Sequence, residues 1–241
     1  MRSLLNDVIH DLVMIDLDGG DGLVALPILY PGGAPVVIRV RRDDDQFIVN
    51  DQGNGYVAAE HMGGASTYLK LAPAVAAMNG VEFDGHMMFA ARVTREWLPS
   101  TIIFAAAASR QAVERTAEKM TVDLEQSLRA NLQDRLRHTF RDRVSLDVEI
   151  AGGSTKKRKF AARIDAGDHV SVFDLVTPHH VSINGAIVKF QDIAQLDAPV
   201  SGVAVLSDQN KVDTGDIALL SQWASKIIPL NANDATLREA A

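Results

Sequence analysis

The sequence predicts an α+β protein in which two separate sheets are joined by a long helical segment. Short apolar runs separated by turn-forming residues come first, at 23–29, 36–42 and 46–50. Residues 97–140 then contain no glycine and one proline, and from 144 onward strand-like runs alternate with helical stretches. We therefore expect an N-terminal antiparallel meander with helices over 1–95, a long helical connector over 96–141 and a C-terminal mixed-sheet α/β module over 142–230. The polar residues 231–241 are expected to form a frayed tail.

Each element of the first module follows from a local pattern. Apolar residues at 4, 5, 8, 9 and 12 share one helical face, which predicts a short amphipathic helix over 3–12. The glycine- and aspartate-rich residues 16–22 are typical of a turn. Helices are expected over 56–62 and near 69–78, and a further strand over 87–93.

The connector carries an apolar face of its own. Leu124, Leu128, Leu132, Leu136 and Phe140 recur every four residues, the spacing of a single helical stripe. This face either docks on a module of the same chain or pairs with a second copy, giving a homodimer through residues 120–140. Residues 121–123 could divide the span into two helices.

The second module is expected to order its elements as helix, three strands, helix, strand, helix, strand. The strands are expected over 144–150, 159–164, 169–176, 203–206 and 226–230, and the helices over 181–194 and 216–224. Three meandering strands followed by strand–helix–strand crossovers make a mixed sheet with helices packed on it.

Composition excludes several chemistries. None of the 241 residues is cysteine, which rules out disulfides, thiolate catalysis, iron–sulfur clusters and cysteine-ligated zinc, and agrees with a cytoplasmic location. The apolar run at 102–108 is far shorter than a membrane span, so no membrane partner is expected. The net charge is −7, yet residues 129–163 hold ten Lys/Arg and four acids, +6, which leaves −13 elsewhere. Such polarity guides an anionic partner to one face, or reflects two compensating surfaces.

Known catalytic and metal motifs are incomplete or absent. Asp16 and Asp18, in Met-Ile-Asp-Leu-Asp-Gly-Gly, resemble the signature of haloacid-dehalogenase-type phosphatases, but Gly20 stands where that pattern has Thr or Val. A calcium loop counted from Asp16 would need glutamate where Pro27 stands. The sequence has no His-Glu-x-x-His, Gly-x-Ser-x-Gly or glycine-rich phosphate loop, so no cofactor is expected.

A basic segment is the sharpest charged feature. Lys156, Lys157, Arg158 and Lys159 fall at a predicted hairpin, and Arg135 and Arg141 lie nearby in the sequence. These cations are candidate contacts to nucleic-acid phosphates, and the alternative is a solvated turn. Few aromatic residues accompany them, so base stacking is not indicated.

Residues 23–64 resemble an uncharacterised two-module bacterial and phage family. The order of features is an apolar strand, a Val-Val-Ile-Arg-Val strand, a third strand ending in Asn50-Asp51-Gln52-Gly53, and a short helix ending in Gly-Gly. The family carries a Thr-Asp-Asp-Gly signature after that third strand, and this chain keeps Asp51 and Gly53 of it. Residues 128–230 resemble the family's second module. The resemblance implies a prokaryotic or phage host and a role near mobile elements or defence.

The helix–three strands–helix–strand order of the second module also resembles the restriction-endonuclease-like core. Such nucleases place an aspartate near one strand and Glu-x-Lys on the next, to hold Mg²⁺ and steady the attacking water. Asp165 fits the first position and Asp174 the second, but Val176 stands where lysine is required. The sequence therefore favours a non-catalytic or cryptic interaction protein that binds protein or nucleic acid. The alternative is a Mg²⁺-dependent nuclease or phosphatase that uses Asp16, Asp18, Asp165 or Asp174.

Overall fold

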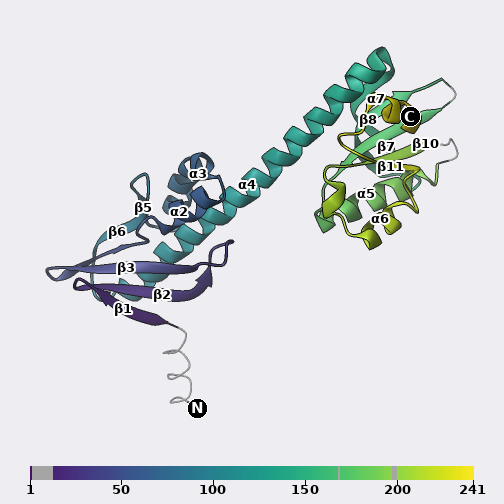
Figure 1. Ribbon diagram of the computed structural model, residues 1–241. Coiled ribbons are helices and arrows are strands. Elements are labelled where there is room, and N and C mark those ends of the chain that lie inside the picture. Colours follow the sequence, from purple (N-terminus) through teal and green to yellow (C-terminus); the bar gives the residue numbers. More distant parts are fainter. Residues whose placement is uncertain (2–12, 168, 197–199) are drawn as a thin grey trace. The chain divides into compact units, whose positions relative to one another are not determined.

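The computed structural model describes residues 1, 13–167, 169–196 and 200–241, in two compact units, Met1–Asp123 and Leu124–Ala241 (Figure 1). The helix expected over 3–12 lies outside the described residues. Two separate sheets are present, as predicted, one in each unit. Within the described ranges, no helix combines the length and the apolar character needed to cross a membrane.

The first unit is built on a six-stranded antiparallel sheet, as the predicted meander required. Its order is β1-β2-β3-β4-β6-β5, with β1 Met14–Asp18, β2 Asp21–Leu29, β3 Pro35–Asp43, β4 Gln46–Asn50, β5 Glu82–Phe83 and β6 Met88–Val93. The prediction of a turn over 16–22 is wrong. Those residues form the β1–β2 hairpin, and only Gly19 and Gly20, with φ of 59° and 93°, make its turn. Two adjacent residues with positive φ are what a two-residue hairpin loop of type I′ requires.

Three helices cover one face of this sheet. They are α2 Asn54–His61, α3 Ala65–Met78 and the first part of α4 Leu98–Phe140. Val36, Ile38 and Val49 from the sheet pack with Tyr68 of α3 and with alanines of α4 in one core. The small side chains of α4 in this region let its backbone approach the sheet closely.

Helix α4 contributes to the cores of both units. It continues without a break through residues 121–123, where Thr121 donates its hydroxyl hydrogen bond to the carbonyl of Ala117 inside the helix. Leu132, Leu136 and Phe140 are buried in the second unit, as the docking interpretation predicted, whereas Leu124 of the same stripe is exposed. The long helix expected over 96–141 is thus present as α4, and each of its halves packs in the core of one unit.

The second unit contains the predicted mixed sheet. The order is β11-β10-β9-β8-β7, with β7 Val144–Ala151, β8 Lys157–Asp165, β9 Val170–Val176, β10 Val200–Leu206 and β11 Lys226–Pro229. Strands β7, β8 and β9 pair antiparallel, whereas β9, β10 and β11 are parallel. The crossovers are α5 His180–Ile193 and α6 Thr214–Leu220, so the order helix–three strands–helix–strand is observed.

Both faces of this sheet are covered. Phe173, Val203 and Val205 pack against the second half of α4 and against α7 Asp234–Ala240, while Val172 and Ala204 face α5 and α6 on the other side (Figure 1). Alternate residues of each strand thus serve two cores, which explains why these strands read as continuous apolar runs.

The prediction of a frayed tail over 231–241 is wrong. Asn233 accepts a hydrogen bond from the backbone N–H of Thr236 and caps α7, whose Leu237 and Ala240 are buried in the core. Ser171 on β9 also donates to the carbonyl of Ala241. The segment is mostly polar, but Leu237 and Ala240 lie three residues apart, on the same side of a helix, and both reach the core.

Candidate functional site

Strands β8 and β9 separate within the second unit. Their pairing runs from Asp165↔Val170 to Ala162↔Phe173, and no further pairs extend toward the start of β8. We call the place where the two strands part the fork. Asp174 is the first residue of β9 beyond the last pair, so its carboxylate lies at the fork.

The carboxylate of Asp174 is buried and held by two cations. Its side chain is only 3% exposed. The Nζ of Lys189, from α5, lies 2.6 Å from one carboxylate oxygen, and Nη1 of Arg129, from α4, lies 3.5 Å from the other. Burial raises the pKa of Asp174, and the ammonium and guanidinium groups oppose that rise by favouring the ionised form.

Arg129 also donates to the backbone of β8 beside the fork. Its Nη2 donates to the carbonyl of Phe160 at 2.8 Å, and Gln133, one helical turn later, donates to the carbonyl of Ala161 at 3.0 Å. Both carbonyls lie on the part of β8 that has parted from β9, where buried acceptors need other donors. Side chains of α4 thus donate hydrogen bonds to two successive carbonyls of β8.

A second carboxylate approaches Arg129 from β7. The Nε and Nη2 of Arg129 lie 3.1 and 3.0 Å from one oxygen of Asp147. A hydrogen bond from Gln133, followed by Arg129, lowers the pKa of Asp147. Arg129 therefore bridges the carboxylates of Asp147 and Asp174.

The residues of the fork do not fit Mg²⁺. The nuclease alternative needs several carboxylates free to hold the ion. Here Lys189 and Arg129 occupy the oxygens of Asp174, and the described part of the chain contains no group of three or more His, Asp or Glu side chains able to hold a metal.

The other predicted acids lie away from the fork. Asp165 pairs with Arg163 at 2.7 Å, and the register places it four positions along β8 from the residue opposite Asp174, about 13 Å away. Asp16 and Asp18 lie on the exposed edge strand β1 of the first unit. The structure does not bring these candidates together.

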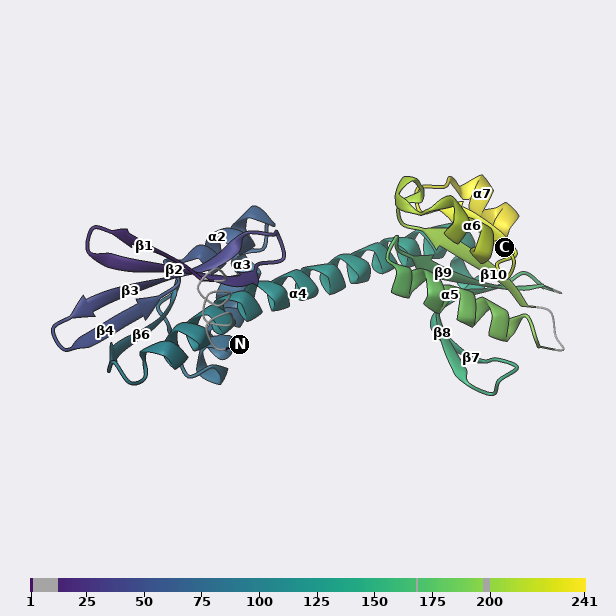
Figure 2. The same ribbon diagram turned by 90° about the horizontal axis from the view of Figure 1, so that it is seen from below.

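The predicted basic residues do not form one cluster, and Arg158 is paired inside the unit. Arg158 is half-buried and its Nε lies 2.6 Å from Asp192 on α5, which also accepts two hydrogen bonds from Ser154. These donors lower the pKa of Asp192 to about 2. Together they fasten the β7–β8 hairpin to α5, which lies beside it (Figure 2). Arg158 is thus a structural anchor, a role that the basic run did not indicate.

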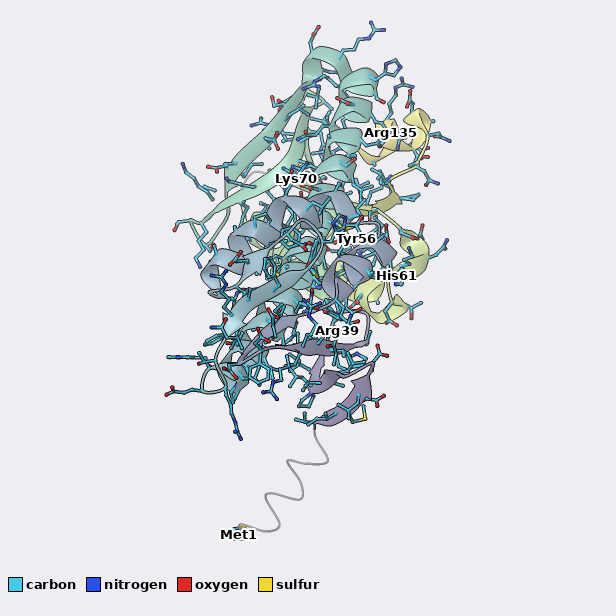
Figure 3. The ribbon with its side chains drawn as sticks, turned by 90° about the vertical axis from the view of Figure 1, so that its left-hand side faces the viewer. Met1, Arg39, Tyr56, His61, Lys70 and Arg135 are labelled. Carbon is cyan, nitrogen blue, oxygen red and sulfur yellow. The ribbon has the colours of Figure 1, made fainter. Side chains whose placement is uncertain are left out.

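Two more of the basic candidates lie away from the hairpin. Arg135 points toward the C-terminal segment, where it donates to the carbonyl of Ala232 (Figure 3). Arg141 precedes β7, while the hairpin follows it, so about 23 Å of strand separates them.

The remaining lysines border an open groove. Lys157 and Lys159 are 76% exposed and share Glu149, at 3.9 and 3.5 Å. Lys156 is exposed at the same hairpin. We call the adjoining hollow of about 690 Å³ the α5 groove; its lining residues are Lys157, Arg158, Lys159, His180, Val181, Asn184, Gly185, Val188 and Lys189. Because Lys189 also holds Asp174, the groove adjoins the fork.

Asp51 and Gly53 have a structural role in the first unit. The carboxylate of Asp51 is fully buried and accepts hydrogen bonds from the backbone N–H groups of Gly53, Gly55 and Met88 and from Ser109 Oγ. Gly53 has a φ of 73°. Asp51 therefore ties the end of β4 to α2, β6 and α4. Burial raises its pKa, against the opposing effect of these donors.

Sequence reasoning missed Arg129, Gln133, Asp147 and Lys189. The one available signal was a lysine inside the apolar run Ile187-Val188-Lys189-Phe190, which suggests a buried partner.

Comparison with known proteins finds no matching family model and no matching curated protein.

Proposed function

We propose that this chain is a non-catalytic binding protein whose second unit recognises an anionic partner through the α5 groove. The observation that carries the proposal is that Lys189 and Arg129 form ion pairs with the carboxylate of Asp174. The Nζ of Lys189 lies 2.6 Å from the buried carboxylate of Asp174. This pairing supports a structural role for Lys189 more than a catalytic role in which the lysine orients a water molecule.

The rim of the groove supplies the attraction. Lys156, Lys157 and Lys159 are exposed, and Glu149 is the acid beside them. Exposed cations at a groove attract phosphates or carboxylates in a salt-dependent manner. Nucleic acid and acidic protein both belong to this class of partner.

The resemblance around Asp51 and Gly53 supports a setting for this activity. We propose a bacterial or phage cytoplasm and a role near mobile elements or defence. A fold related to restriction endonucleases, in which Lys189 and Arg129 pair with Asp174, is consistent with a binding role in that setting.

A charge-reversal experiment tests the proposal. A fluorescent DNA duplex and labelled polyglutamate are titrated with the full chain, and anisotropy is recorded at low and high salt. We expect Lys157→Glu/Lys159→Glu to weaken binding of at least one probe about tenfold or more. The control Lys70→Glu/Lys211→Glu makes the same change in net charge with residues that do not line the groove (Lys70 is labelled in Figure 3). No binding of either probe, or an equal loss in the control, refutes the proposal.

Magnesium separates this proposal from the enzyme alternative. We expect Mg²⁺ neither to raise the unfolding temperature nor to promote cleavage of DNA or a phosphomonoester. A Mg²⁺-dependent stabilisation that Asp174→Ala or Asp16→Ala abolishes would establish the alternative instead.

A further inference from the structure

Helix α5 presents apolar side chains to solvent along the floor of the groove. Val181 is 63% exposed and Val188 is 46% exposed. They are seven residues apart, two helical turns, and therefore lie on the same side of the helix. Asn184 and Gly185 lie between them and also line the groove.

Gly185 keeps the middle of this floor open. Glycine within a helix costs about 1 kcal/mol relative to alanine. A Cβ added at Gly185 would meet no atom within 4 Å, so packing among the described residues does not require a glycine here. The absence of a side chain leaves room for a group of a partner between the two valines.

The rim and the floor together indicate the chemistry of that partner. The cations of Lys157 and Lys159 suit carboxylates or phosphates, but an aliphatic floor contributes nothing to phosphate contacts. Stacking of bases relies on aromatic side chains, and the imidazole of His180 is the one aromatic ring in the lining, which has no Phe, Tyr or Trp and so offers little stacking surface. An apolar floor with a cationic rim matches a peptide that carries both aliphatic and acidic side chains.

We infer that the α5 groove binds an acidic segment of another protein, which places an aliphatic side chain over Gly185 between Val181 and Val188. Its carboxylates lie at Lys157 and Lys159. This inference rests on the proposed function, because it names the partner of the same groove.

The variant Gly185→Gln tests the inference without changing charge. Glutamine favours the helix more than glycine does, and the space beside position 185 accepts a side chain. We therefore expect an unfolding temperature no lower than that of the original chain, with the floor of the groove filled.

A random peptide library displayed on phage is selected against the full chain and counter-selected against Gly185→Gln. We expect the enriched peptides to combine Asp or Glu with Leu, Ile or Val, and to bind Gly185→Gln at least about tenfold more weakly. Lys157→Glu/Lys159→Glu should weaken them similarly. The absence of enriched peptides, enrichment of peptides without acids, or equal binding to Gly185→Gln overturns the inference.

The duplex DNA probe distinguishes the two levels of failure. DNA binding that is lost in Lys157→Glu/Lys159→Glu but unchanged in Gly185→Gln would make the groove a nucleic-acid site. That result overturns the inference while the proposed function stands. Insensitivity of both DNA and peptide binding to the lysine substitutions overturns both.

Discussion

Replacing Lys189 by methionine should destabilise the second unit, because it removes a cation from a buried carboxylate. The methionine retains the apolar stem of the lysine and loses the Nζ that lies 2.6 Å from Asp174. Asp174 is 3% exposed and cannot recover this interaction from water. Arg129 remains 3.5 Å away and compensates only in part.

The expected loss follows from the burial of the two partners. Removing one partner of a buried ion pair costs roughly 3–5 kcal/mol. Lys189 is 30% exposed, and solvent already screens part of the pair, so we expect about 2 kcal/mol. This loss lowers the urea midpoint of the second unit by roughly 1 M.

The opposite substitution should cost less. Asp174→Asn leaves Lys189 and Arg129, each 30% exposed, free to reach water, and we expect a loss of about 1 kcal/mol or less. The double variant Lys189→Met/Asp174→Asn should recover most of the stability lost in Lys189→Met. The destabilisation in Lys189→Met should also depend on pH. The pKa of Asp174 in the folded chain is raised above its unfolded value. In acid the carboxyl is protonated and makes no ion pair, so Lys189→Met costs little stability. The cost grows as the pH rises through the folded-state pKa and the carboxylate forms.

Tryptophan fluorescence during urea unfolding measures these differences. Trp223 belongs to the second unit and the exposed Trp97 to the first, so Trp97→Phe isolates the second unit's signal. Lys211→Met serves as a control, since this lysine is exposed and pairs only with Asp208. The reasoning is refuted if Asp174→Asn destabilises as much as Lys189→Met, or if the double variant is the least stable of the three.

Three further predictions concern other contacts. Asp51→Ala removes the acceptor of three buried backbone N–H groups, while Ser109 keeps its hydrogen bond with Tyr30, and should cost roughly 2–4 kcal/mol in the first unit. Fluorescence of Trp97 in a Trp223→Phe background measures the loss, and an unchanged midpoint would contradict the structural role. Asp192 has a pKa lowered from 3.8 to about 2, so its contribution is present above pH 4 and lost as the pH falls toward 2, which a fall in amide protection factors (exchange relative to the intrinsic rate at each pH) in the β7–β8 hairpin should report. Asp192→Asn should abolish that pH dependence. Leu237→Ala should cost about 2–5 kcal/mol of stability in the second unit. An unchanged urea transition of Trp223 would instead support the prediction that residues 231–241 are frayed.

Local patterns were sufficient for most of the fold. The glycine-free stretch ending at Phe140 and the alternation of apolar runs after Val144 predicted α4 and the strands of the mixed sheet. Two errors have local causes. Residues 16–22 appeared too rich in glycine for strands, yet two glycines suffice for the β1–β2 turn, and an exposed edge strand tolerates Asp16 and Asp18. Leu237 and Ala240 are too few to mark a docked helix by periodicity.

The candidate site was less predictable because its members are far apart in the sequence. Arg129, Asp147, Asp174 and Lys189 come from four different elements, and only the register of β8 against β9 places them at one fork. Charge counting selected the run at 156–159, but it could not show that Arg158 is bound to Asp192 while Lys157 and Lys159 face solvent.

The sequence by itself determined that helices and strands form where they do, because helix and strand periodicity are properties of neighbouring residues. It also determined two sheets and a chain without cysteine chemistry. The tertiary structure alone decided that Asp174 is paired with Lys189 and Arg129, and that Gly185 and two exposed valines line one groove. Ion pairing and burial depend on distances between residues remote in the chain, and those distances exist only once the sheet and its helices have packed.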